Sequence, residues 1–225
     1  MIITAVSSLI NGGVDLLQII AMVTMLLDHI GLIWDIPFLR VLGRLSMPIY
    51  AYLLVCGYHH TSSFKRYYLR LLLWAFVAQP WYLIALAKSN LCILATWLFC
   101  LVVLRASEGK GFLTCLSLIS LLVLSCLIPM DYGLIAVLWV ILFDNLFYKQ
   151  NIFVVFMCIF GLIFSAVVTA DYIQLVSFCS LFFVIACKYS DFERVKYSRG
   201  FKAFYHCFYP VHLFLLGCIR LFNPI

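Results

Sequence analysis

Charged side chains are scarce in this sequence, and their scarcity excludes a water-soluble globular protein. Only 11% of the 225 residues are Asp, Glu, Lys or Arg, whereas 66% are hydrophobic. Soluble domains usually carry about a quarter charged residues and under half apolar ones. A globule of the present composition has too few polar side chains to cover its surface. The mean hydropathy is +1.13, and the sequence predicts an integral membrane protein.

Several short motifs are also missing, and each absence argues against a class of site. CxxC and HxxxH spacings do not occur, so no metal ion is expected. GxxxG and the glycine-rich phosphate loops of soluble nucleotide-binding folds are missing as well. The ten cysteines lie within apolar runs and are predicted to be small packing residues. The N-terminus has no basic stretch, so no cleavable signal peptide is predicted.

Long apolar runs predict an all-α fold, a polytopic transmembrane helical bundle of about nine spans. A spanning helix needs about 20 mostly apolar residues. The connections between runs are short, so a single membrane domain over residues 1–225 is expected. The predicted spans cover residues 14–34, 38–58, 67–87, 90–104, 111–128, 132–148, 151–169, 172–187 and 203–221. The fourth and eighth are short, and either could be re-entrant.

Basic residues between these runs are distributed unevenly. Ten of them fall in the gaps that share a side with the N-terminus, and two can be assigned to the opposite side. The ten are Lys65, Arg66, Arg105, Lys110, Lys149, Lys188, Arg194, Lys196, Arg199 and Lys202, and the two are Lys88 and Arg220. Cytoplasmic loops carry the excess of Lys and Arg. The pattern predicts a cytoplasmic N-terminus and an outward C-terminus, and it explains the net charge of +6 without a nucleic-acid partner.

Three ionisable residues lie deep in predicted spans: Asp28, Arg44 and Arg70. Each costs about 2.5–3.5 kcal/mol at a helix centre, so together they cost on the order of 7–10 kcal/mol if unpaired. Such residues persist where they face a bundle interior or a wet cavity and find partners. We therefore expect these three to mark a buried-pair or functional site.

Neighbouring polar residues add to this picture. Asp28 and His29 are adjacent, so on a helix they project about 100° apart and each needs a partner on another helix. Arg40 and Arg44 are four apart and repel each other unless an anion is near. Asp28 or a phosphate-bearing ligand is the candidate anion for Arg44. Arg40 is equally placed to extend its side chain to the outer headgroups.

Other polar residues have an ordinary structural explanation beside a functional one. His59 and His60 are expected either to lie at the headgroup level or to act as proton acceptors, whereas His212 lies near mid-span. Gln79 precedes a proline that can open the helix to a cavity, or merely kink it. Asp131 is expected to cap the helix that follows it.

Motifs along most of the chain resemble the TraX family of membrane proteins. The resemblance covers roughly residues 14–220 and is weak across the seventh and eighth spans. Its motifs are Asp28-His29-Ile30, Leu42-Gly43-Arg44-Leu45-Ser46-Met47-Pro48, Arg70 with Ala78-Gln79 and Tyr82, Asn90 to Leu94, Tyr132-Gly133-Leu134, and Phe208-Tyr209-Pro210-Val211-His212-Leu213.

The founding TraX acetylates the N-terminal amine of conjugative pilin, so the resemblance implies a multi-pass acetyltransferase of a bacterial cytoplasmic membrane. It implies acetyl-CoA as acyl donor and an acceptor that is an amine or a hydroxyl, on a pilin-like N-terminus or another cell-envelope molecule. A proton-coupled transporter, or a non-enzymatic membrane partner of a secretion apparatus, is the alternative, because buried ionisable groups suit carriers equally well.

Acyl transfer needs a base and a group that stabilises the oxyanion. His29 is the expected base, with His212 or the His59–His60 pair as second choice. Asp28 is expected to orient a histidine or to anchor an arginine. The remaining assignments are Arg44, Arg70 and Arg40 for CoA phosphates or the carbonyl oxygen, and Gln79, Tyr132 and Tyr209 for substrate contacts or structure.

Overall fold

The computed structural model describes residues 13–189 and 199–222, and these are helical apart from the connections and an isolated bridge between Leu91 and Met130. The helices are α2 (Gly13–Ile33), α3 (Pro37–Gly43), α4 (Ser46–His60), α5 (Phe64–Leu86), α6 (Ile93–Ala106), α7 (Phe112–Leu127), α8 (Gly133–Asp144), the π-helix η1 (Asn145–Lys149), α9 (Ile152–Val168), the 3-10 helix η2 (Tyr172–Phe178), α10 (Cys179–Tyr189) and α11 (Arg199–Phe222). The all-α prediction is confirmed.

Each of the nine predicted spans corresponds to a helical segment, but the second is interrupted. Its first part is α3 and its second is α4, with Arg44 and Leu45 between them. Pro48 explains the break, because it has no N–H to bond the carbonyl four residues earlier, which is that of Arg44. The Ser46 hydroxyl instead donates to the Gly43 carbonyl over 2.8 Å. The break places Arg44 at a bend inside the bundle.

Helix lengths support only part of the predicted nine crossings. Four segments are long and apolar enough to cross a membrane, namely Leu16–Ile33, Pro37–His60, Phe64–Leu86 and Tyr172–Tyr189. Shorter apolar helices cover Ile93–Ala106, Phe112–Leu127, Ile152–Val168 and Cys207–Phe222. The segments therefore indicate a helical membrane protein.

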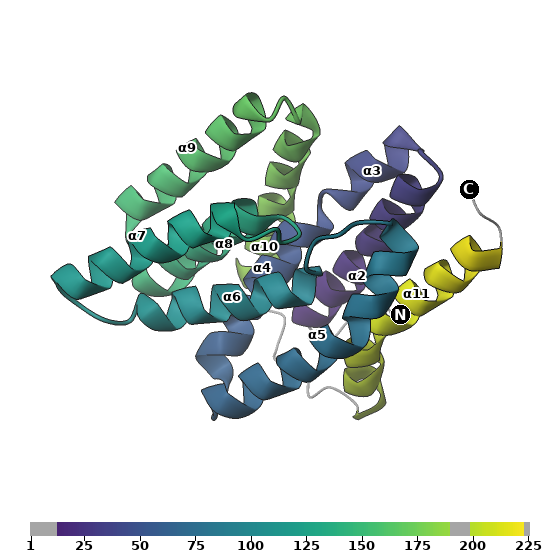
Figure 1. The fold of residues 1–225 in the computed structure, drawn as a ribbon. Coiled ribbons are helices and arrows are strands. Elements are labelled where there is room, and N and C mark those ends of the chain that lie inside the picture. The colour runs from purple at the N-terminus through teal and green to yellow at the C-terminus, as the bar shows by residue number, and fades with distance from the viewer. Residues whose placement is uncertain (1–12, 190–198, 223–225) are drawn as a thin grey trace, which may run out of the picture.

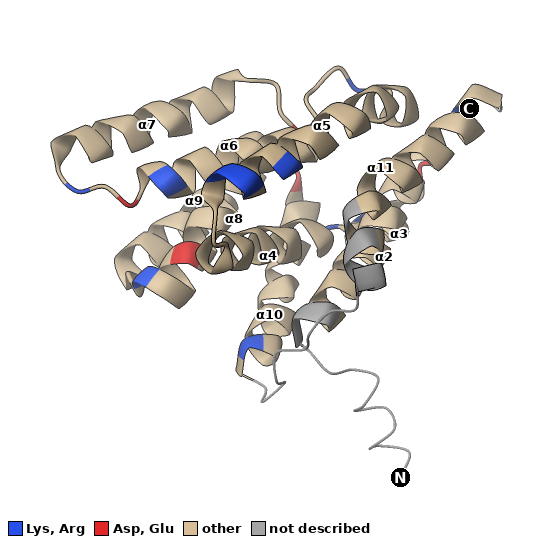
Figure 2. Cartoon of the chain, turned by 90° about the horizontal axis from the view of Figure 1, so that it is seen from below, with Lys and Arg blue, Asp and Glu red and all other residues tan. Residues whose placement is uncertain are grey.

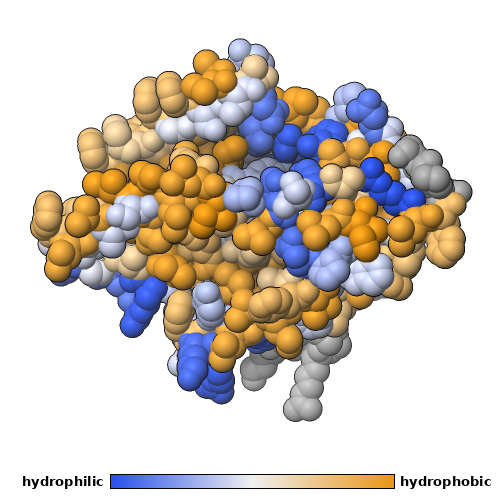
Figure 3. All heavy atoms as spheres, viewed as in Figure 1, coloured by the Kyte–Doolittle hydropathy of each residue, from blue (hydrophilic) through white to orange (hydrophobic). Residues whose placement is uncertain are grey.

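Hydrophobic side chains cover much of the outside. Phe112 of α7 is 80% exposed and Phe160 of α9 is 67% exposed. Figure 3 shows a largely hydrophobic face interrupted near its centre by a hydrophilic area. Lys, Arg, Asp and Glu gather at helix ends and connections, and α7 carries none (Figure 2). A lipid environment accounts for such a surface.

Helix α4 lies inside the bundle and packs against α2, α6, α8 and α10. Helix α11 runs along α5, and the shorter α7 and α9 lie at the outside (Figure 1). None of the ten cysteines, all of which lie in the described residues, forms a disulfide. The space between the α2–α4 pair and the group formed by α5, α6 and α11 holds the site described next.

Candidate functional site

Two adjoining cavities open between the helices of the described part of the chain. The larger, the aromatic chamber, has a volume of about 270 Å³ and seven aromatic residues in its wall: Tyr50, Tyr67, Trp74, Trp97, Tyr132, Tyr205 and Tyr209. The smaller, the polar chamber, has a volume of about 210 Å³. Nine of its twelve lining residues are polar: Asp28, His29, Arg40, Arg44, Lys88, Asp131, Tyr132, Asp171 and Gln174.

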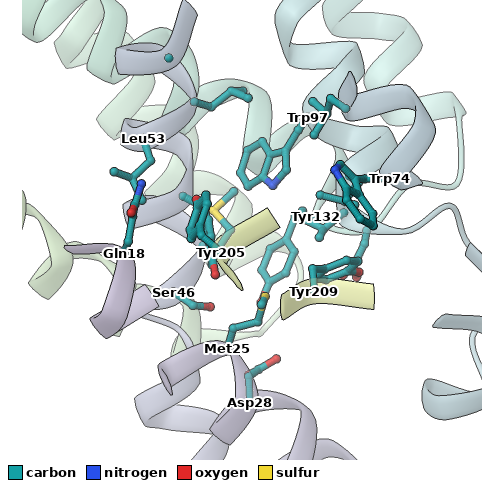
Figure 4. Close-up of a pocket in the computed structure, with 18 of the residues that line it drawn as sticks. Gln18, Met25, Asp28, Ser46, Leu53, Trp74, Trp97, Tyr132, Tyr205 and Tyr209 are labelled. Atoms are coloured by element: carbon teal, nitrogen blue, oxygen red, sulfur yellow. The ribbon is translucent and has the colours of Figure 1, made fainter. Parts of the chain in front are cut away.

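The two chambers meet, because both are lined by Asp28, His29, Asp131 and Tyr132. From this junction the aromatic chamber extends toward the N-terminal parts of α2 and α5 and the last turn of α4. Arg70 of α5 lies at this end of the chamber. In Figure 4 Tyr132, Tyr205 and Tyr209 lie between Asp28 and the two tryptophans Trp74 and Trp97. The polar chamber extends the other way, toward the C-terminal end of α5.

His29, which lines both chambers, forms a buried pair with His212, which lines neither. His29 is 6% and His212 is 5% exposed, and 2.8 Å separates Nδ1 of His29 from Nε2 of His212. Nδ1 of His212 lies 2.8 Å from the Phe208 carbonyl oxygen, which can only accept a hydrogen bond. A neutral His212 thus donates through Nδ1 and accepts through Nε2. His29 must then donate through Nδ1, so its Nε2 carries the lone pair.

Arginine and lysine side chains around the polar chamber are each paired with an aspartate. Arg40 lies 2.7 Å from Asp28, Arg44 lies 3.1 Å from Asp171, and Lys88 lies 3.2 Å from Asp131. Asp28 is therefore the partner of Arg40, and the pairing considered for it with Arg44 is wrong. Arg40 reaches inward to that carboxylate rather than outward to headgroups. Pairing with an opposite charge lowers the cost of holding each of these side chains between apolar helices.

Asp131 does not cap α8, contrary to the expectation from the sequence. The residue at the cap position is Tyr132, whose side chain makes no capping hydrogen bond. Asp131 instead accepts from Lys88, and its carbonyl accepts from the Thr96 hydroxyl over 2.8 Å. The Asp131 carboxylate is thus engaged by Lys88 and not by the first N–H groups of α8.

Tyr132 adopts a left-handed backbone conformation with φ of +61°, which a bulky residue rarely adopts. Its hydroxyl accepts from the Arg44 guanidinium over 3.0 Å, so its own hydrogen is available to another acceptor. Strained backbones persist where the surroundings hold them, and they cluster at functional sites. Here the strain directs a polarised hydroxyl to the junction of the two chambers.

Gly43 permits the close approach of α3 to α2. A Cβ atom at this position would lie 2.3 Å from Cβ, 2.5 Å from Oδ1 and 2.6 Å from Cα of Asp28. Real Cβ atoms do not come that close to a backbone atom, so any larger residue must push the helices apart. The glycine thereby fixes the position of the Asp28 carboxylate.

Some residues selected from the sequence lie elsewhere. His59 lies 2.7 Å from Asp144, and His60 bonds the Cys56 carbonyl over 2.8 Å; neither lines a chamber. Gln79 ties the α5–α6 connection through the Asn90 carbonyl and the Cys92 N–H. Among the described residues, no group of three or more His, Cys, Asp or Glu side chains is placed to hold a metal ion.

Arg70 lies apart from the other two arginines. It lines the aromatic chamber, with its guanidinium 5.7 Å from the centre of the Tyr67 ring. Within the described part of the chain no carboxylate forms an ion pair with it. The three arginines selected from the sequence are thus divided between the two chambers.

Sequence reasoning did not select several residues of this site. Asp171 follows α9 in a connection, and the sequence places Lys88 only among the basic residues that indicate topology. Gln18, Trp74 and Trp97 lie in apolar runs and line the aromatic chamber. Of these three, Gln18 could have been selected from the sequence, because a side-chain amide within an apolar span needs a hydrogen-bond partner.

The apolar helices indicate a helical membrane protein, and paired charges lie in a polar site between its helices. The family model described as "TraX protein" matches residues 13–220, and the chain belongs to the TraX family. It is also 38% identical over 72 residues to the "Probable fimbrial assembly protein FimC, serogroup H1" of Dichelobacter nodosus. That match covers 29% of this chain and 30% of the relative's length. No solved structure matches the chain.

Proposed function

We propose that this protein is a membrane-embedded acetyltransferase that moves an acetyl group from acetyl-CoA to an amine or hydroxyl acceptor. The observation that carries the proposal is the position of His29 where the two chambers meet. His212 sets its tautomer, so that Nε2 is the basic nitrogen. A neutral imidazole is the usual base for activating an acceptor, and the two chambers offer separate places for donor and acceptor.

The aromatic chamber suits the donor. At about 270 Å³ it is smaller than the roughly 300–1,000 Å³ that enclose a drug-sized ligand. It accommodates the acyl-pantetheine arm and leaves the nucleotide outside. Arg70 lies along this chamber without a carboxylate partner in the described residues, so it can bind a CoA phosphate. Arg40 and Arg44 are occupied by aspartates and are poorer phosphate ligands.

The chemistry follows from the junction. Nε2 of His29 takes the proton of the acceptor, and the acceptor's oxygen or nitrogen attacks the thioester carbonyl carbon. The Tyr132 hydroxyl, polarised by Arg44, donates to the oxyanion that forms. The C–S bond then breaks, and the departing CoA thiolate receives the proton from His29. His212 and Asp28 position these groups, the latter by holding Arg40.

The proposal includes the membrane topology. Nine crossings with a cytoplasmic N-terminus in a bacterial cytoplasmic membrane put the Arg70 end of the aromatic chamber on the cytoplasmic side, where acetyl-CoA is made. The polar chamber then faces the outside, as does the C-terminus. Helices under 18 residues cross by local thinning of the bilayer or by snorkelling of flanking residues.

Arg70→Gln is expected to raise the KM for acetyl-CoA about tenfold and to leave kcat nearly unchanged, because a charge-assisted phosphate contact contributes about 1.5–3 kcal/mol to binding. Steady-state kinetics of the detergent-purified protein measure this. Acetyl-pantetheine, which lacks the nucleotide, should be used equally well by both proteins. Arg66→Gln, one turn earlier on α5, is the matched control. An unchanged KM in Arg70→Gln would contradict the assignment.

Tyr132→Phe is expected to lower kcat about a hundredfold, because it removes one oxyanion donor and little volume. The KM for acetyl-CoA should stay within about twofold, since ground-state binding does not use this hydroxyl. Single-turnover transfer of radiolabelled acetyl groups measures the loss. Tyr67→Phe, in the wall of the aromatic chamber away from the junction, is the control and should retain kcat. Equal losses in both variants would argue for a structural role.

A proton-coupled carrier is the second candidate, because two chambers that meet at ionisable residues also suit alternating access. An experiment with radiolabelled acetyl-CoA distinguishes the enzyme from the carrier. Label transfer to an acceptor supports the enzyme, whereas proton-driven uptake into proteoliposomes without CoA binding supports the carrier. The printed name of the Dichelobacter nodosus relative supports a link to fimbrial assembly, as acetylation of a pilin-like protein or as a non-enzymatic partner of a secretion apparatus.

A further inference from the structure

Met25 lies on the same face of α2 as two residues at the junction of the chambers. It comes three residues before Asp28 and four before His29, the spacings that place side chains over one another on a helix. Met25 lines the aromatic chamber but not the polar one, and it is 7% exposed. Figure 4 shows its side chain directed from α2 into the chamber. Met25 therefore forms part of the wall of the aromatic chamber next to the junction.

The Met25 side chain also reaches across the space between the helices. It belongs to a buried cluster with Ala78 of α5 and Tyr209 of α11, whereas Leu17, two turns earlier on α2, belongs to the cluster of α4, α6 and α8. The ring centres of Tyr209 and His29 are 6.4 Å apart, so this contact lies beside the expected base. Met25 thus narrows the aromatic chamber at the end where the acyl group would react.

Little room remains at this end for an acyl group larger than acetyl. In the proposed reaction the acyl carbonyl lies at the Tyr132 hydroxyl, so a longer carbon chain needs space beside it. The aromatic chamber, at about 270 Å³, is already smaller than the roughly 300–1,000 Å³ that enclose a drug-sized ligand. In the other direction lies the polar chamber, where added methylene groups would displace water from three ion pairs.

We propose that Met25 is the specificity-determining residue of the donor site and restricts the donor to acetyl-CoA by occupying the space that a longer acyl chain needs. The inference rests on the proposed function and adds to it the selection among short-chain acyl thioesters of CoA. Replacement of Met25 by alanine removes Cγ, Sδ and Cε, and a cavity left by a truncated core side chain closes only in part. The space released there can hold the carbons by which propionyl and butyryl exceed acetyl.

Donor preference tests the inference. Detergent-solubilised membranes of the native cell lacking the gene supply the acceptor, and the purified protein is added with radiolabelled acetyl-, propionyl- or butyryl-CoA. The parent is expected to use acetyl-CoA with a kcat/KM about a hundredfold or more above that for butyryl-CoA, because a pocket discriminates one methylene by about 10–200-fold. Met25→Ala is expected to narrow this ratio to about tenfold, through a gain with butyryl-CoA.

Three matched variants complete the test. Met22→Ala removes the same atoms from a side chain that is 4% exposed, lies one turn earlier on α2 and lines neither chamber, so it should keep the parent's ratio. Met25→Leu conserves the volume and should keep it as well. Met25→Val removes less volume than alanine and should gain with propionyl-CoA alone. This gain decides the matter if Met25→Ala does not fold.

The failure of the inference and the failure of the proposed function are distinguishable. An unchanged donor ratio in both Met25→Ala and Met25→Val, or an equal gain in Met22→Ala, overturns the assignment of Met25 and leaves the acetyltransferase intact. Equal use of acetyl- and butyryl-CoA by the parent does the same. Absence of protein-dependent label with every donor overturns both.

Discussion

Replacing His29 by asparagine is expected to lower the kcat of acetyl transfer about a thousandfold, the range in which loss of a general base falls. The asparagine amide can still donate to Nε2 of His212, which now receives its hydrogen bond from Nδ1 of His29 over 2.8 Å. The buried pair therefore keeps its hydrogen bond while the basic nitrogen disappears. Radiolabelled transfer by the detergent-purified protein measures kcat, and acetyl-CoA binding should stay within about twofold.

Two further histidine variants separate chemistry from folding. His60→Ala removes a ring that hydrogen-bonds the Cys56 carbonyl, packs edge-on against Tyr148 and lies outside both chambers, so it should keep full activity. His212→Ala frees the tautomer of His29 and should lower kcat by an intermediate amount, about tenfold to a hundredfold. Should His29→Asn retain more than a tenth of the activity, His29 is not the base.

Gly43→Ala is expected to destabilise the protein by about 1–3 kcal/mol or more, the cost of overpacking a filled interior. The added carbon would lie 2.6 Å from Cα of Asp28, and a backbone atom cannot rotate away. Separation of α2 and α3 would stretch the 2.7 Å ion pair between Asp28 and Arg40 and displace His29. Acetyl transfer should therefore fall with stability.

Thermal unfolding in detergent, followed by intrinsic fluorescence, should show a Tm lowered by about 3 °C or more. Gly217→Ala is the matched control, because Gly217 is also buried in a helix but its added carbon would meet the Trp81 ring at an ordinary 3.4 Å. That variant should lie within about 1 °C of the parent. Equal Tm values for the two variants would contradict the close contact at Gly43.

Helix positions were predictable because lipid requires the backbone to satisfy its own hydrogen bonds, so every long apolar run becomes a helix. The break between α3 and α4 was not predicted, although Pro48 is visible in the sequence. Composition cannot show whether a proline within a span starts a new helix or only kinks one. Nor can it fix the number of crossings, because several apolar helices, such as Ile93–Ala106 and Phe112–Leu127, are shorter than the four long segments.

At the site, the free-energy cost of burying a charge singled out Asp28 and Arg44 from the sequence, but it did not identify the residue with which each forms an ion pair. Asp28 and Arg40 are twelve residues apart, and their pairing depends on the turn before α3 and on the space at Gly43. Asp171 is 127 residues from Arg44, so only the tertiary packing brings them together. The position of Asp131 just before α8 favoured a helix cap, but its carboxylate forms an ion pair with Lys88 instead.

The most direct test of the two-chamber account is a structure of the protein bound to a non-hydrolysable acetyl-CoA analogue, determined by cryo-electron microscopy in lipid nanodiscs. We expect the pantetheine arm between Trp74 and Tyr209, a phosphate at Arg70, and the acyl carbonyl within about 3–3.5 Å of the Tyr132 hydroxyl, beside His29. An analogue bound in the polar chamber or on the outer surface, with the aromatic chamber filled by lipid, would contradict it.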